Sequence, residues 1–325
     1  MFDNITNMKG EAMKRYLVKR LIQLLILLVG ITFIVFASMS LSPGDPAELV
    51  AGPNATLEDI ERMRVFLGLD KPFFVQYFNY LIGIFTGDFG TSITTRQPVL
   101  SEILQRLPMT INLSVAAMLV AIIIGIPIGI IAALKRDSWI DQLMTTTSLF
   151  GISIPNFWLG SMLILLFAVK LGWLDTGGMT EFFWTPKGFR QAILPALALG
   201  TSVAAQFMRI GRTSMLEVMQ SDYIRTAKAK GIPKSKIILV HALRNALIPL
   251  LTIFGTSFGG LLGGAIVTER VFVINGIGTY LIQAINARNY PAVQSTVLII
   301  AFMFVVVNLV IDLLYIVVDP RISYE

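Results

Sequence analysis

Long apolar stretches without a single Asp, Glu, Lys or Arg dominate this sequence. A helix needs about 20 apolar residues to cross the hydrocarbon core of a bilayer. The stretches lack the period-two alternation of a lipid-exposed β-barrel. The sequence therefore predicts an all-α membrane protein with six transmembrane helices. We place them near Leu21–Ser42, Met109–Leu134, Gln142–Val169, Gln191–Met208, Ala246–Thr268 and Pro291–Ile311.

The composition agrees with a membrane fold and excludes several kinds of chemistry. Charged residues make up 14% of the 325 residues, whereas soluble domains usually carry about 25%. There is no cysteine, which excludes disulfides and thiolate chemistry, and the single histidine, His241, leaves no histidine cluster for a metal. The sequence has no Walker A motif and no evident catalytic constellation. We therefore expect no catalytic, metal or cofactor site, and any ATP that drives this chain must bind to another chain.

The distribution of Lys and Arg predicts the orientation of the spans, because basic residues favour cytoplasmic loops. Basic residues precede the first span, whereas the loop 43–108 holds more acidic than basic residues. The next loop carries Lys135 and Arg136, and the loop Arg209–Asn245 is strongly basic. Both termini are therefore predicted to be cytoplasmic. A signal peptide is the alternative for the first span, but its apolar run is too long and no A-x-A site follows.

This topology divides the chain into four regions. They are a disordered leader (1–12), a cytoplasmic lead-in with the first span (13–42), an extracytoplasmic loop domain (43–108) and a five-span core (109–325) with a cytoplasmic loop at 209–245. Met13 is an alternative start of the chain.

The loop domain is predicted to be helical rather than a bare linker. Thr56 is a favourable N-cap with Asp59 at N3, and the apolar spacing that follows ends at Gly68 and Pro72. The aromatic-rich stretch 72–90 is too short to span the membrane, so we predict a helix packed on the outer membrane face.

The predicted spans contain no ionisable residue, which argues against a proton-coupled carrier, although sodium sites made from carbonyl and hydroxyl oxygens remain open. The spans instead contain glycines, several at four-residue spacing, which lets two helices approach closely. We predict a helix-packing role for Gly125, Gly129, Gly255, Gly259, Gly260, Gly263 and Gly264.

The stretch "GISIPNFWLG" places a proline beside an asparagine inside the third span. A buried asparagine amide must find partners on another helix or along a wet pathway. Ser153, Pro155 and Asn156 are therefore candidates either for helix packing or for lining a pathway.

One long basic segment, 222–250, stands out from the apolar sequence around it. Asp222 can cap a short helix, Tyr223–Lys230, which Gly231 would end at C′ before Pro233 starts the next helix. We expect the short helix to expose two bases and two alanines, Arg225, Lys228, Ala227 and Ala229. Such a helix suits a groove in another protein. The alternative is a basic loop on anionic lipid, which explains the charges but not the Gly–Pro break.

The segment "DYIRTAKAKG…HALRNALIP" resembles the cytoplasmic loop motif of ABC-importer permeases, specifically the dipeptide, oligopeptide and nickel permease family. The resemblance runs from about Met13 to the end of the chain. The supporting stretches are "LVKRL", "LSPGDPAELV", "LGLDKP", "GDFGTS", "GISIPNFWLG", "ILPALALG", "RTSMLEV", "GIGTYL", "NYPAVQ" and "DPRIS".

The resemblance implies a type I importer permease fold in which the short helix couples the chain to an ATPase subunit. The generic motif reads Glu-Ala-Ala where this chain has Arg225-Thr226-Ala227, a departure that is usual in the peptide and nickel branch and that removes an acidic contact. The implied coupling residues are Asp222, Tyr223, Arg225, Thr226, Ala227, Lys228, Ala229, Lys230, Gly231, His241, Arg244 and Asn245.

The implied function is alternating-access import of di- or oligopeptides in a bacterial or archaeal cell membrane. The implied partners are a homologous permease, two ATP-binding subunits that hold ATP and Mg, an extracytoplasmic solute-binding protein and lipid, with no nucleic acid. One alternative is the same machine with another cargo, a nickel chelate or glutathione. The others are a self-sufficient channel or secondary carrier, and a membrane-embedded enzyme, which no catalytic constellation supports.

Overall fold

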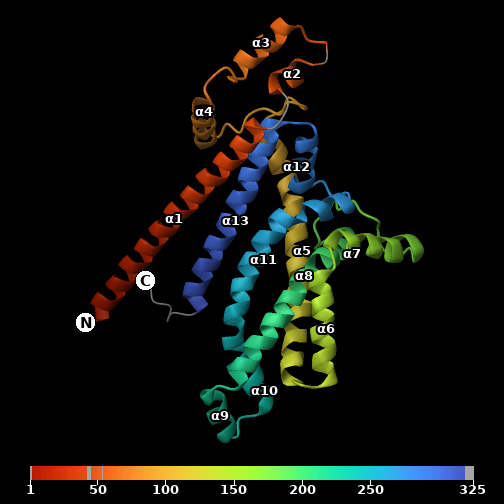
Figure 1. The fold of residues 1–325 in the computed structure, drawn as a ribbon. Coiled ribbons are helices and arrows are strands. Elements are labelled where there is room, and N and C mark those ends of the chain that lie inside the picture. The colour runs from red at the N-terminus through yellow and green to blue at the C-terminus, as the bar shows by residue number, and fades with distance from the viewer. Residues whose placement is uncertain (1, 42–44, 53, 319–325) are drawn as a thin grey trace. The chain divides into compact units, whose positions relative to one another are not determined.

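The computed structural model describes residues 2–41, 45–52 and 54–318, which are mostly helical (Figure 1). The chain forms two compact units. The first contains the described residues up to Pro108 together with Gly276–Met303, and the second contains Met109–Asn275 and the described residues 304–318.

Among the described residues, five helices are long and apolar enough to cross a membrane, or six if one bent pair counts as a single span. This confirms the prediction of an all-α membrane protein. The five segments are Val18–Ser40, Val99–Leu134, Pro186–Met219, Lys234–Gly263 and Tyr290–Leu313. The first lies in helix α1 (Phe2–Ser40), the second is α5 (Val99–Leu134), and the last lies in α13 (Tyr290–Val318).

The third predicted span is the bent pair. Helix α6 (Trp139–Ser153) ends before Ile154, and α7 (Asn156–Leu163) continues as the π-helical segment η1 (Ile164–Lys170), with a bend of 101° between the two parts. Pro155 causes the break, since it lacks an N–H and keeps the preceding residue out of the helical region; Ile154 has ψ 125°. The structure therefore differs from the continuous span predicted over Gln142–Val169.

Helix α8 (Pro186–Met219) forms the centre of the second unit. It contacts α6, α7 and the last long helix of that unit, α11 (Leu243–Val271) (Figure 1). It extends beyond the predicted span Gln191–Met208 at both ends, so its last turns occupy the start of the predicted loop 209–245. The Thr185 hydroxyl caps its first turn by accepting from the Gly188 N–H at 3.0 Å.

The amino-terminal region also differs from the prediction. Helix α1 begins at Phe2, whereas we expected a disordered leader over 1–12. The stretch contains no proline, and Lys, Glu, Ala and Met at positions 8–14 are good helix formers that extend the first span toward the terminus.

The loop domain consists of three short helices, α2 (Pro46–Ala51), α3 (Leu57–Phe66) and α4 (Phe73–Thr86), which precede α5. The capping box at the start of α3 confirms the prediction for Thr56 and Asp59. Helix α4 packs on α1 through Tyr77, whose hydroxyl lies 3.1 Å from that of Thr32. A further helix, α12 (Ile277–Asn286), joins this unit through Tyr280, whose hydroxyl donates to Glu102 at 2.8 Å.

Two of the predicted glycine pairs lie at close helix contacts. Gly125 and Gly129 of α5 face the backbone of α8, and a Cβ on Gly129 would lie 2.7 Å from the Met208 carbonyl oxygen. Gly255 and Gly259 of α11 face the side chains of Ile311 and Phe304 of α13, and a Cβ on Gly259 would lie 2.5 Å from the Phe304 ring. These contacts are within the chain, so the four glycines confirm the packing prediction.

The other three predicted glycines also lie on α11. A Cβ on Gly260 would meet nothing within 4 Å, so contacts within the described part of this chain do not require a glycine there, and its packing role stays a prediction. The packing of Gly263 and Gly264 stays a prediction.

The contrast between two of these glycines gives a direct test. Alanine is favoured over glycine in a helix by about 1 kcal/mol, so Gly260→Ala should leave the chain as stable as before or slightly more stable. Gly129→Ala should lower the melting temperature, because the methyl group would overlap backbone that cannot move aside. Size-exclusion thermostability of the detergent-solubilised variants measures both. Equal melting temperatures would contradict the close-contact assignment.

Candidate functional site

The basic segment folds as a short helix, α9 (Asp222–Ala229), with a tightly formed end. Gly231 adopts the left-handed φ of +72°, and its N–H donates to the Lys228 carbonyl at 3.0 Å. The N–H of Ile232 donates to the Ala227 carbonyl at 3.3 Å. This pair of bonds is a Schellman motif, and it confirms the predicted C′ role of Gly231.

The start of α9 differs from the prediction. Ser221 occupies the N-cap position, with an extended backbone, and its side chain accepts no capping bond. Asp222 is the first helical residue rather than the cap. Its carboxylate still lies at the positive end of the helix dipole, where negative charge is favourable.

The inner face of α9 is apolar and buried. Ile224 is 0% and Ala227 6% exposed, and both belong to a core cluster with Met215 of α8. The prediction that Ala227 is exposed is therefore wrong, because three-residue spacing places it on the same face as Ile224. The cluster also contains Ala133, Ile237, Ala242 and Ala246.

The outer face of α9 is basic and open. Exposure was predicted for Arg225, Lys228 and Ala229. The exposed residues of α9 are Asp222, Tyr223, Arg225, Thr226, Lys228 and Ala229, followed by Lys230. The ion pair of Arg225 with Asp222, at 3.4 Å, joins side chains that are 78% and 95% exposed, so it adds little stability.

A polar contact ties α9 to the segment that leads into α11. After α10 (Lys234–Lys236), the π-helical segment η2 (Ile237–Ala242) runs directly into α11. The Asn245 amide donates to the Tyr223 hydroxyl at 2.7 Å and to the His241 carbonyl at 3.3 Å. Of the predicted residues, Tyr223, His241 and Asn245 thus come together, whereas Arg244 is exposed beside them.

A second feature of this unit is a polar cavity of about 340 Å³ between α7, α8 and α11. Asn156 lines it, and its assignment to helix packing or to a pathway stays a prediction. Ser153 and Pro155 do not line it, and the Ser153 hydroxyl instead donates to the Leu149 carbonyl at 2.8 Å. The full lining is Asn156, Leu199, Ser202, Val203, Gln206, Thr256, Ser257, Gly260 and Leu261.

Most of the polar residues in this cavity were not predicted. Ser202 and Gln206 are four residues apart on α8, and Thr256 and Gly260 are four apart on α11. Residues at this spacing share one helix face, so the polar face of α8 was detectable in the sequence, whereas Gly260 adds no polar side chain beside Thr256. That these residues lie close to Asn156 could be recognised only from the folded structure.

An ion pair that the sequence did not indicate joins α6 to α8. Arg212 donates from Nε to Asp141 Oδ1 at 2.6 Å and from a terminal nitrogen to Oδ2 at 2.7 Å. The Asp141 side chain is 5% exposed. Loss of one partner of so buried a pair typically destabilises a protein by about 3–5 kcal/mol, so the pair holds the broken span against α8.

Comparison with solved structures defines the class of fold. A chain of the MetNI methionine ABC transporter, solved in inward-facing conformations, matches 68% of this chain and 98% of its own length with a TM-score of 0.58. At 17% sequence identity this likeness concerns the fold alone. The chain is therefore an all-helical membrane protein with the fold of an ABC-transporter permease.

Sequence comparison then identifies the family. The model "Binding-protein-dependent transport system inner membrane component" matches residues 125–324, and the model of the N-terminal part of such components matches residues 13–114. The chain belongs to this family of binding-protein-dependent transport system inner membrane components.

Curated relatives match along nearly the whole chain. The dipeptide transport system permease protein DppB of Alkalihalophilus pseudofirmus is 43% identical, and the match covers 96% of this chain and 100% of the relative. A putative peptide transport system permease protein of Brucella suis and the glutathione transport system permease protein GsiC of Escherichia coli K12 are each 42% identical with the same coverage.

The left-handed turn after α9 gives a testable prediction. An L-residue with a side chain at the φ of Gly231 costs about 1–2 kcal/mol, so Gly231→Ala should fray the end of α9. Trypsin should then cleave the purified chain faster after Lys228 and Lys230. Gly231→Asn is the control, since asparagine tolerates this conformation. Equal cleavage rates for Gly231→Ala and the parent chain would contradict the Schellman assignment.

Proposed function

We propose that this chain is the membrane-spanning permease subunit of an ATP-driven ABC importer. With a homologous permease chain it forms the pathway for di- and oligopeptides across the inner membrane. The observation that carries this proposal is helix α9, which combines a buried apolar face with an exposed basic face. Such a helix is anchored to its own subunit and still free to dock in a groove of another protein.

The family and the named relatives support the choice of cargo. One curated relative is named for dipeptides, another for peptides and a third for glutathione, itself a small peptide. The polar cavity is compatible with such cargo, because the amides of Asn156 and Gln206 and nearby hydroxyls can both donate to and accept from peptide bonds. Glutathione is the second candidate cargo.

The proposed mechanism is alternating access driven from outside this chain. Two ATP-binding subunits hold ATP and Mg on the cytoplasmic side, where both termini of this chain also lie. An extracytoplasmic solute-binding protein delivers the peptide. ATP-driven closure of the two ATPases moves α9. This subunit itself binds and positions the peptide and transmits that movement to its membrane-spanning helices.

The contacts around α9 suit rigid transmission of its displacement to α8 and α11. Ile224 and Ala227 pack against α8 and η2, and the Tyr223–Asn245 bond holds α9 to the start of α11. Helices α8 and α11 also supply most of the polar cavity lining. A displacement of α9 therefore acts on the two helices whose facing surfaces form the proposed pathway, because close-packed interiors transmit displacement with little compression.

The test uses the absence of native cysteine. Ala229→Cys should crosslink to a co-purifying ATPase subunit when the assembly is isolated gently from its own membranes. Ala227→Cys is the matched control: it lies on the buried face of the same helix and should crosslink at least tenfold less. Transport in liposomes by the purified chain alone, without ATP and with free labelling of Ala229→Cys, would contradict the proposal and favour a self-sufficient carrier or channel.

A further inference from the structure

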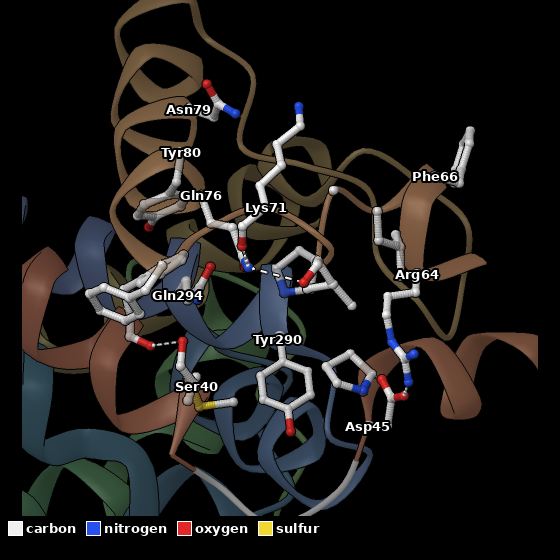
Figure 2. Close-up of a pocket in the computed structure, with 18 of the residues that line it drawn as sticks. Ser40, Asp45, Arg64, Phe66, Lys71, Gln76, Asn79, Tyr80, Tyr290 and Gln294 are labelled. Atoms are coloured by element: carbon white, nitrogen blue, oxygen red, sulfur yellow. Dashed lines mark hydrogen bonds and ion pairs between the residues drawn. The ribbon is translucent and has the colours of Figure 1, made fainter. Parts of the chain in front are cut away.

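The first unit contains a large cavity that is separate from the polar cavity described above. It lies among α2, α3, α4, the end of α1 and the start of α13, and its volume is about 860 Å³ (Figure 2). Small-molecule sites typically measure about 300–1,000 Å³. The cavity is therefore large enough for a short peptide with its side chains.

One part of the cavity lining is aromatic. Phe36 lies within 5.3 Å of Phe73 and 5.9 Å of Tyr80 between ring centroids, and all three residues line the cavity. Tyr290 adds a further ring. Such a surface offers apolar side chains of a ligand a rigid contact at low entropic cost.

Amide side chains line the cavity near these rings. Figure 2 shows Gln76, Asn79 and Tyr80 on the side formed by α4, with Gln294 of α13 nearby. Gln76 donates its amide N–H to the Lys71 carbonyl at 2.7 Å, which leaves its own carbonyl oxygen available. Within the described part of the chain, Asn79 and Gln294 form no side-chain hydrogen bond. These groups can donate to and accept from the peptide bonds of a ligand.

The cavity lining carries more positive than negative charge, since its charged residues are Asp45, Arg64 and Lys71. Asp45 supplies the only carboxylate among the described lining residues. That carboxylate is already committed, since it accepts from the Ala47 N–H at 2.9 Å and pairs with Arg64. Burial opposes its ionisation, but the hydrogen bonds from Arg64 and Ala47 hold the pKa of Asp45 below its ordinary value. Lys71, which is exposed and has no ion pair in the described structure, remains as an uncompensated cation.

We propose that this cavity binds a short peptide through its carboxyl terminus, with the carboxylate at Lys71, the peptide bonds at the amide side chains and an apolar side chain on the aromatic rings. The cavity would hold cargo in the extracytoplasmic loop domain. The cargo identity rests on the proposed function, whereas the preference for a free carboxylate rests on the lining alone.

This charge arrangement makes a selective prediction about the two ends of the peptide. The free ammonium group of a peptide finds no available carboxylate among the described lining residues, so acetylation of the amino terminus should leave binding nearly unchanged. Amidation of the carboxyl terminus removes the partner of Lys71. We expect it to weaken binding roughly three- to tenfold, the range of a partly exposed charged contact.

The experiment uses the full cysteine-free chain in lipid nanodiscs with a single Ser40→Cys substitution. Ser40 is exposed and lines the cavity, and the replacement is nearly isosteric. The rate of maleimide labelling is measured against concentration of alanyl-phenylalanine, its N-acetyl form and its C-terminal amide. The acid and the N-acetyl peptide should protect the thiol at similar concentrations, and the amide should need roughly three- to tenfold more.

Matched variants assign the effect to the cavity. Ser101→Cys, an exposed serine of the same unit outside the lining, should show no protection. Lys71→Gln in the Ser40→Cys background should weaken protection by the acid and abolish the difference between acid and amide. Arg62→Gln removes an equal charge from α3 outside the lining and should change neither.

The inference would be overturned if no peptide protected the Ser40→Cys thiol from maleimide, or if the acid and the amide protected it equally. It would also be overturned if a peptide-free binding protein protected the thiol and peptides did not. A parallel uptake measurement separates this inference from the proposed function. Dipeptide uptake that depends on the chain, without protection at Ser40→Cys, rejects the cavity alone. Protection at Ser40→Cys in a chain that adds nothing to dipeptide uptake rejects the proposed function and leaves the cavity assignment in place.

Discussion

Close backbone contact between α8 and its neighbours is the constraint on which the rest of the second unit depends. Glycines on both sides permit it: Gly129 of α5 faces the Met208 carbonyl of α8, and Gly200 of α8 faces the Ala117 carbonyl of α5, with 2.6 Å to a hypothetical Cβ. In lipid, helices gain little from hydrophobic burial against each other, so small residues that allow close van der Waals packing decide which helices associate. The Asp141–Arg212 pair then adds a specific polar contact that holds α6 on the same helix.

This packing places two features on one rigid helix, α8. Gln206 and Ser202, in its middle, face the polar cavity, and Met215, near its end, packs against Ile224 of α9. Helix α11 repeats the arrangement, since Asn245 bonds Tyr223 of α9 while later turns of α11 line the cavity. The chain needs no catalytic group for the proposed role. It needs two stiff helices between a docking surface and a pathway. A charge buried in that pathway would need a partner.

The parts that sequence alone predicted are those that depend on local physics. Apolar length defined most spans, Thr56 defined a helix start and Gly231 a helix end. The proline beside Asn156 was noticed, but the size of the bend depends on where α7 packs. The Asp141–Arg212 pair joins residues 71 positions apart, and no local pattern indicates such a partner.

The buried face of α9 and the lining of the polar cavity also could not be predicted without the folded structure. Helical spacing shows that Ile224 and Ala227 share a face, but only the surrounding cluster determines that this face is the buried one. The cavity residues of α8 and α11 are ordinary Ser, Thr and Gln in apolar helices. They gain significance only because Asn156 of a third helix meets them.

In the proposed mechanism, ATP-driven closure of the ATPase subunits moves α9 and changes the side of the membrane from which the polar cavity is accessible. The most direct measurement is the labelling of a single Ser257→Cys by a membrane-impermeant maleimide, in the assembled transporter, from each side of sealed vesicles. This mechanism predicts labelling from the cytoplasmic side without nucleotide and from the opposite side when ATP is trapped. Labelling from the same side in both states would contradict it.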